Sequence, residues 1–136
     1  MSKDKIRIYL SGAMTDVDED ISVAWRYEAI KSLVGAMCFN PWEYFDFESN
    51  IDNRQVMNYD LYRLKNSDIV LVNFDYNSKS LGTMAEIAIA HNLGIPIIGV
   101  HSEYNELHPW QINICEVIFG SVHEACNYIT EFYLEE

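Results

Sequence analysis

The sequence predicts an α/β protein built as a doubly wound sheet of five parallel strands with helices on both faces. Short apolar segments alternate with segments of roughly ten to fifteen residues that have helical spacing, a pattern typical of parallel sheets. Residues 67–74, SDIVLVNF, are almost continuously apolar, as expected of a strand covered on both faces. The chain has 136 residues, 49% of them hydrophobic, so residues 1–136 match the size and core of one flavodoxin- or Rossmann-like domain.

The first half of the chain predicts two strands and two helices in alternation. Residues 6–10, IRIYL, are rich in β-branched and aromatic side chains and predict a strand, which SGAMTD interrupts. Helical spacing runs through residues 20–36, and Gly35 is placed to end that helix. A short strand, MCF, precedes an aromatic and acidic loop at 41–53, and a second helix spans about 53–65.

The second half continues the alternation. After the strand at 67–74 and the loop DYNSKSLG, helical spacing covers residues 83–93, and Gly94 stands where a helix is expected to end. Residues 95–100, IPIIGV, predict another buried strand. Residues 101–113 are expected to form a polar, aromatic loop with room for one helical turn.

One strand and one helix complete the predicted fold. EVIF, at 116–119, is a short apolar run that predicts the last strand. Ser121 and Glu124 have the spacing of a capping box, which predicts a final helix over 122–134.

Composition limits the classes of partner. Nine basic and 21 acidic residues give a net charge of −12, which disfavours nucleic acid and anionic membranes as partners. Backbone amides can still bind a small anionic ligand such as phosphate. No apolar run approaches the roughly 18 residues that a membrane span needs, and MSKDK is too short and polar for a targeting segment.

The cysteines and histidines do not predict a disulfide or a metal site. Cys38, Cys115 and Cys126 are odd in number and lack a CxxC motif, so we expect free thiols and a cytoplasmic location. The four histidines lack ligand spacing relative to these cysteines, so zinc is not expected. We expect no metal and no cofactor.

Ligands of doubly wound sheets bind outside the carboxyl ends of the strands. This rule selects four segments of the chain: SGAMT, NPWEYF, DYNSKSLG and HSEYNELHP. In the first of these, Ser11 and Gly12 could cradle a phosphate or sugar with their backbone amides, or could form a tight turn that binds nothing.

Three aspartates have competing interpretations. Asp60 lies on the helix before the main strand, where it either pairs with Arg63 on a solvated face or belongs to a site. Asp68 opens the main strand, at the end away from ligands, and is expected to act as a turn or cap. Asp75 closes that strand at the ligand end, where it is either functional or only solvated.

Glu86, in SLGTMAE, is the most informative acidic residue. Thr83 and Glu86 have the spacing of a capping box, which would make Glu86 structural. Alternatively, a carboxylate fixed near a helix N-terminus, at the ligand end of the sheet, can act as a nucleophile. Asp60 and Glu86 are then candidates for the two carboxyl groups of a glycosidic-bond site, one attacking the sugar and one assisting the leaving group.

Three segments, IYLSGAMT, NYDLYRLKNSDIVLVNFD and SLGTMAEIAIAHNLGIPIIGV, resemble the nucleoside 2-deoxyribosyltransferase family in order and spacing. The superfamily includes relatives that hydrolyse nucleoside 5′-monophosphates. The resemblance covers about residues 6–100 and is clearest over 58–100. It implies an enzyme of nucleotide metabolism and salvage that cleaves or exchanges the N-glycosidic bond through a covalent deoxyribosyl–glutamate.

Carried over by position, the resemblance implies a role for four residues. Glu86 matches the nucleophile, and Asp60 matches an aspartate near the nucleophile and the sugar. Tyr9 matches a tyrosine whose hydroxyl positions the nucleophile. Gly82 matches a glycine that allows close approach.

Position 80 departs from the transferase pattern. The transferases carry a second aspartate six residues before the nucleophile, whereas this chain has Ser80. The monophosphate-hydrolysing relatives have SLG there, and their serine binds the 5′-phosphate. The resemblance therefore implies a nucleotide substrate, with Ser11 and the Gly12 amide as further phosphate contacts, and it counts against efficient base exchange.

The family completes its site with polar residues of a neighbouring subunit, so the resemblance implies a homodimer or a larger homo-oligomer with shared sites. Gln111 and Asn113 lie in about the right place, and Asn113 is expected to bind substrate. Two functions remain open from the sequence. The first is an N-glycosidase or deoxyribosyltransferase, and the second is a non-catalytic nucleotide-binding or sensing domain on the same fold.

Overall fold

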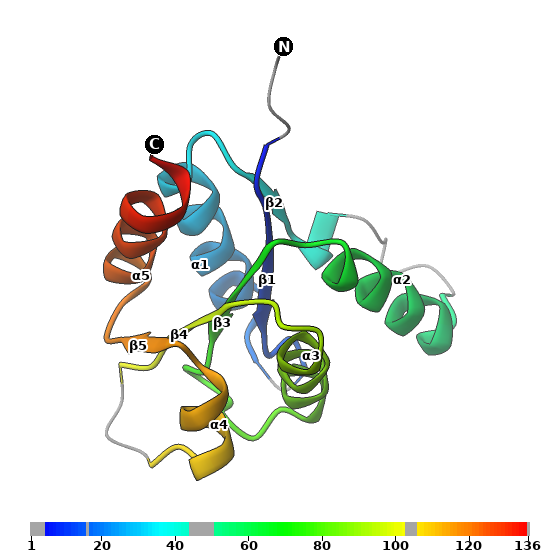
Figure 1. The fold of residues 1–136 in the computed structure, drawn as a ribbon. Coiled ribbons are helices and arrows are strands. Elements are labelled where there is room, and N and C mark those ends of the chain that lie inside the picture. Colours follow the sequence, from blue (N-terminus) through cyan, green and yellow to red (C-terminus); the bar gives the residue numbers. More distant parts are fainter. Residues whose placement is uncertain (1–4, 16, 44–50, 103–105, 136) are drawn as a thin grey trace.

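Five parallel strands form one sheet in the order β2-β1-β3-β4-β5, which confirms the predicted doubly wound fold (Figure 1). The computed structural model describes residues 5–15, 17–43, 51–102 and 106–135. The strands are β1 (Arg7–Gly12), β2 (Met37–Phe39), β3 (Ile69–Asn73), β4 (Ile97–Val100) and β5 (Val117–Phe119).

The helices alternate with the strands along the chain. They are α1 (Glu19–Ser32), α2 (Asn53–Lys65), α3 (Leu81–Asn92), α4 (Pro109–Ile114) and α5 (Val122–Ile129), with a 3₁₀ turn η1 (Pro41–Glu43) and a π-helical turn η2 (Thr130–Leu134). Within the described ranges, no helix is long and apolar enough to cross a membrane.

The strand residues alternate between two apolar layers, because successive side chains of a strand point to opposite faces. Ile8 and Leu10 of β1 pack in the layer that holds α1 and α5. Tyr9, between them, packs in the other layer with Leu64 of α2 and Ile87 of α3. Helices therefore cover both faces of the sheet (Figure 1), and β1 presents its odd-numbered residues to α3.

Most predicted boundaries lie within a few residues of the observed ones, and the differences have local causes. The helix predicted at 83–93 begins at Leu81, because Ser80 caps it. The helix predicted at 122–134 widens into a π-helical turn after Ile129. The helical turn expected within 101–113 is α4, and residues 44–50 of the loop predicted at 41–53 lie outside the described residues.

The winding direction of the sheet changes between β1 and β3. From β1 the chain passes through α1 to the edge strand β2, and α2 then brings it back to β3 on the other side of β1. The connections diverge at the carboxyl ends of these two central strands, which is where doubly wound proteins bind their ligands.

Candidate active site

Two hydroxyl groups of β1 hold the Glu86 carboxylate. Tyr9 Oη donates to Glu86 Oε2, and Ser11 Oγ donates to Glu86 Oε1 over 2.8 Å. Positions 9 and 11 share one face of β1, which is the face that α3 covers. The sheet and the helix together thus give each carboxylate oxygen its own donor.

The N-terminus of α3 is capped by Ser80 and not by Thr83. Ser80 Oγ accepts from the Thr83 amide over 3.3 Å and from Thr83 Oγ1 over 3.1 Å. The capping-box interpretation of Thr83 and Glu86 is therefore wrong, because it placed the start of the helix three residues too late. Glu86 lies in the second turn of α3, where its carboxylate points to β1.

A cleft of about 490 Å³ opens beside Glu86, between α2, the start of α3 and the loop after β1. The candidates from the sequence Asp60, Ser80 and Gly82 line it together with Glu86 and Gly12. The other lining residues are Met14, Thr15, Asn53, Val56, Met57, Leu61, Thr83 and Ala85. Its walls are thus mostly apolar, with two carboxyl groups among them.

Asp60 has a different environment from Glu86. Its Oδ1 is buried and has no hydrogen-bond partner among the described residues. Burial, and then the nearby charge of Glu86, raise the pKa of Asp60 from its ordinary 3.8 to about 7, while the charge of Arg26 acts in the opposite direction. Arg63, the alternative partner from the sequence, donates Nε to the Tyr59 hydroxyl over 3.2 Å.

The hydrogen bonds distinguish the two carboxyl groups. Burial raises the pKa of Glu86 above its ordinary value, and the hydrogen bonds from Tyr9 and Ser11 and the charge of Arg26 oppose that rise because they stabilise the ionised form. Among the described residues, Asp60 Oδ1 has no such donor. Around neutral pH, the pair is therefore expected to carry its charge on Glu86 and its shared proton on Asp60.

The tyrosine hydroxyl stays protonated in this environment. Burial and the charges of Glu86 and Asp60 raise the pKa of Tyr9 far above its ordinary value, so it donates to Glu86 at all physiological pH values. Its ring stacks on Phe39, with centroids 5.2 Å apart, which fixes the direction of the hydroxyl.

Two glycines at the cleft have different reasons for being glycine. A Cβ on Gly12 would lie 2.9 Å from Trp25 Cζ2 and 3.2 Å from the Asn73 carbonyl oxygen, so Gly12 is required by packing. A Cβ on Gly82 would meet no atom of the described residues within 4 Å. Because Gly82 lines the cleft, its missing side chain leaves open space there.

Ser11 has a partner other than the phosphate that the sequence led us to expect. Its side chain is 1% exposed, is absent from the cleft lining and donates to Glu86. Ser11 thus supports the nucleophile candidate from behind. Ser80, in contrast, lines the cleft at the N-terminus of α3, where phosphate binding was expected.

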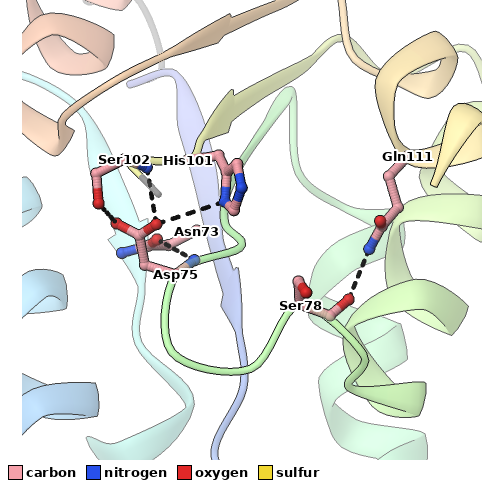
Figure 2. A network of polar contacts seen from close by, with 6 residues as sticks. All are labelled: Asn73, Asp75, Ser78, His101, Ser102 and Gln111. Carbon is pink, nitrogen blue, oxygen red and sulfur yellow. Dashed lines mark hydrogen bonds and ion pairs between the residues drawn. The ribbon is translucent and has the colours of Figure 1, made fainter. Parts of the chain in front are cut away.

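The other aspartates have structural contacts. Asp68 Oδ2 accepts from the Arg7 amide over 2.8 Å, which agrees with a turn or cap role. Asp75 accepts from the amide and the hydroxyl of Ser102, over 2.8 and 2.7 Å, and lies 3.5 Å from His101 Nδ1 (Figure 2). Asp75 therefore links the loops that follow β3 and β4.

The two polar residues of α4 do not reach the cleft of their own chain. Gln111 donates to the Ser78 carbonyl over 2.7 Å (Figure 2) and accepts from the His108 amide, so it anchors α4 to the loop before α3. Asn113 is exposed on α4 and does not line the cleft. Its expected contribution to the site of a neighbouring subunit stays a prediction.

The sequence interpretation missed Arg26, which is 0% exposed. Its guanidinium donates to the carbonyls of Leu10, Gly12 and Ser22 and to Ser22 Oγ, beneath the end of β1. The helical spacing holds a signal for it, since position 26 shares a face with the core residues Ala29 and Leu33.

The described lining of the cleft holds two carboxyl groups in unlike environments, those of Asp60 and Glu86. Among the residues that the structure describes, no group of three His, Cys, Asp or Glu side chains could hold a metal ion.

Together, the fold and the cleft define a doubly wound α/β protein with two neighbouring carboxyl groups at the carboxyl ends of its central strands. The model of the nucleoside 2-deoxyribosyltransferase family matches residues 8–129, and the chain belongs to that family. Membership supports glycosyl transfer or N-glycosidase chemistry on a nucleoside-type substrate. No curated protein sequence matches the chain significantly.

Solved structures share the fold at low sequence identity. A conserved protein from Enterococcus faecalis V583 has a TM-score of 0.79 and 14% identity, over 94% of this chain and 99% of that chain. A 2-deoxyribosyltransferase from Bacillus psychrosaccharolyticus has a TM-score of 0.75 and 21% identity, over 90% and 91%. The CMP N-glycosidase BcmB from Clostridium botulinum has a TM-score of 0.65 and 17% identity, over 94% and 98%.

Proposed function

We propose that this protein cleaves the N-glycosidic bond of a nucleoside 5′-monophosphate or a (deoxy)nucleoside, with Glu86 as the nucleophile. The observation that carries the proposal is the Glu86 carboxylate, held by the hydroxyls of Tyr9 and Ser11 at the edge of a cleft. Two fixed donors preorient this carboxylate and favour its ionised form, which suits attack on an electron-poor carbon.

The proposed reaction has two steps. In the first, an oxygen of Glu86 forms a bond to C1′ of the sugar while the C1′–N bond breaks and its electron pair leaves with the base. Asp60, which holds a proton near neutral pH, delivers it to the departing base. In the second step, Asp60 takes a proton from water while the water oxygen bonds to C1′ and the bond between C1′ and Glu86 breaks. In the transfer reaction, an incoming base takes the place of water, gives its N–H proton to Asp60 and receives the sugar.

Ser80 favours a phosphorylated substrate and hydrolysis. Its side chain lines the cleft at the N-terminus of α3, where backbone amides and the helix dipole favour an anion. Its hydroxyl accepts from Thr83, which leaves the hydroxyl hydrogen available to a phosphate oxygen. The transferase aspartate that assists base exchange has no counterpart at this position, so we expect water to be the main acceptor.

The experiment that tests the proposal is a substrate panel read by chromatography. Purified protein is incubated with the common deoxynucleosides, their 5′-monophosphates and the ribonucleoside 5′-monophosphates, including CMP, with and without an acceptor base. Release of free base identifies hydrolysis, and a new nucleoside identifies transfer. Absence of turnover over the whole panel would contradict the proposed enzymatic activity. The alternative, a non-catalytic nucleotide-binding domain, would then remain.

Glu86→Gln tests the nucleophile, because the amide has the size of the carboxylate but cannot attack C1′. We expect this variant to lose base release and to keep its far-UV circular dichroism. The matched control is Glu28→Gln, which removes the same charge from an exposed position of α1. A Glu86→Gln variant as active as the control would refute the assignment of Glu86.

A further inference from the structure

Arg26 is a buried cation without a direct anionic partner. It is 0% exposed, and every hydrogen bond it makes within the described residues goes to a neutral oxygen: the carbonyls of Leu10, Gly12 and Ser22, and Ser22 Oγ. Burying a charge is costly unless opposite charges compensate for it. Neutral carbonyls satisfy its geometry but do not supply such a charge.

The compensating charge expected near neutral pH is that of Glu86, which lines the cleft on the other side of the end of β1. The titratable groups that act on Arg26 are Glu86 from α3, Tyr9 from β1 and Asp60 from α2. The ionised form of Glu86 favours the protonated guanidinium, and in return Arg26 favours the ionised Glu86. Within the described residues, Arg26 and Glu86 share no hydrogen bond, and each of them binds groups of β1 near its end.

The contacts of Arg26 also hold the strand end that carries Ser11. Nη2 donates to the Gly12 carbonyl over 3.0 Å and Nε donates to the Leu10 carbonyl over 3.4 Å. Ser11, between these two carbonyls, donates its hydroxyl to Glu86. The planar guanidinium thus clamps the backbone on both sides of one of the two donors to the proposed nucleophile.

We propose that Arg26 is a positioning residue of this site, whose buried charge favours the ionised form of Glu86 and whose hydrogen bonds fix the direction of Ser11. Only the role of Arg26 in catalysis rests on the proposed function. The proposed electrostatic link between Arg26 and Glu86 does not depend on substrate turnover, so the two proposals are tested separately.

The test is a carboxyl ¹³C NMR titration of the full chain, with Asp60→Asn and Glu86→Gln used to assign the two signals. In Arg26→Gln we expect the apparent pKa of Glu86 to rise by about one unit or more, because the variant removes an opposite charge from its surroundings. Arg26→Lys keeps the charge and should keep the titration near that of the wild type.

Lys31→Gln is the matched control, because it removes the same charge from an exposed position of the same helix. It should leave the Glu86 titration unchanged. A folded Arg26→Gln protein with the wild-type titration would overturn the proposal. For an active enzyme, the acid limb of the pH profile of kcat/KM should move upward by the same amount in Arg26→Gln, which a loss of packing alone would not cause.

Arg26→Gln could also leave Glu86 buried without compensation and prevent folding. In that case the double variant Arg26→Gln/Glu86→Gln should recover the folded circular dichroism spectrum, because it removes the uncompensated carboxylate. If Glu86→Gln alone folds and the double variant does not, Arg26 acts through packing and the proposal is wrong.

Discussion

Asp60→Asn should make the fold more stable at alkaline pH while it impairs the proposed chemistry. The amide has nearly the shape of the carboxyl group but never ionises. In the folded protein the pKa of Asp60 is raised from 3.8 to about 7, mainly by burial and then by the charge of Glu86. The folded state therefore holds the Asp60 proton more strongly than the unfolded chain does.

The sign and size of the effect follow from this difference. Above about pH 7 the ionised Asp60 destabilises the fold, and below about pH 4 it is protonated in both states and the cost is absent. A difference of about three pKa units corresponds to at most about 4 kcal/mol. Because Asp60 is only partly buried, solvent screens its charge, and we expect Asn to stabilise the fold by about 1–3 kcal/mol at pH 9.

Urea unfolding followed by circular dichroism at pH 5 and pH 9 measures this gain. The difference in the free energy of unfolding between Asp60→Asn and wild type should be large at pH 9 and should shrink at pH 5. Glu28→Gln, at an exposed site, should show no such pH dependence. An Asp60→Asn variant that is equally or less stable at pH 9 would refute the assignment of a raised pKa to Asp60.

The remaining predictions concern the cleft and its supports. Gly12→Ala should lower the free energy of unfolding by about 1–3 kcal/mol in thermal melts, because its Cβ would clash with Trp25 Cζ2, whereas Gly82→Ala should melt like wild type and fail only in substrate turnover. Ser80→Ala should lower the free energy of unfolding by about 0.5–2 kcal/mol, because α3 loses its N-cap. The same variant should raise KM more for a 5′-monophosphate than for its nucleoside, and equal changes in KM would argue against a phosphate contact. Tyr9→Phe removes one of the two donors to Glu86, so the acid limb of the pH–rate profile should move upward, and an unmoved limb would show that this hydrogen bond does not hold the carboxylate ionised.

The alternation of apolar segments was sufficient to predict the order and type of the main elements. Buried parallel strands have continuous apolar runs, and glycine marks the helix ends, as Gly35 and Gly94 do with φ angles of +97° and +76°. The local sequence pattern gave the wrong N-cap for α3, where both Ser80 and Thr83 have side chains that can cap a helix. Thr83-x-x-Glu86 has the spacing of a capping box, but Ser80 is the cap, because Tyr9 and Ser11 already bind the Glu86 carboxylate.

The candidate site could be predicted in part. The edge of the sheet that binds ligands follows from the alternation of strands and helices. The resemblance to a family indicated the site residues Tyr9, Asp60, Ser80 and Glu86. Their environments could not be predicted, because burial and hydrogen bonding depend on which elements pack together. Ser11 was expected to face a ligand, and it instead supports Glu86 from the buried side.

The sequence by itself determined the doubly wound fold and the loops at the edge of the sheet where ligands bind. The reason is that the spacing of apolar residues and the positions of turn residues are local properties of the chain. Only the tertiary structure decided how the two carboxyl groups differ. Residues 9, 11, 26, 60 and 86 come from four separate elements, and their charges interact only when the sheet and its helices bring them together. Glu86 then gains two donors and a buried cation that favour its charge, while Asp60 Oδ1 has no donor among the described residues and Asp60 keeps its proton up to about pH 7.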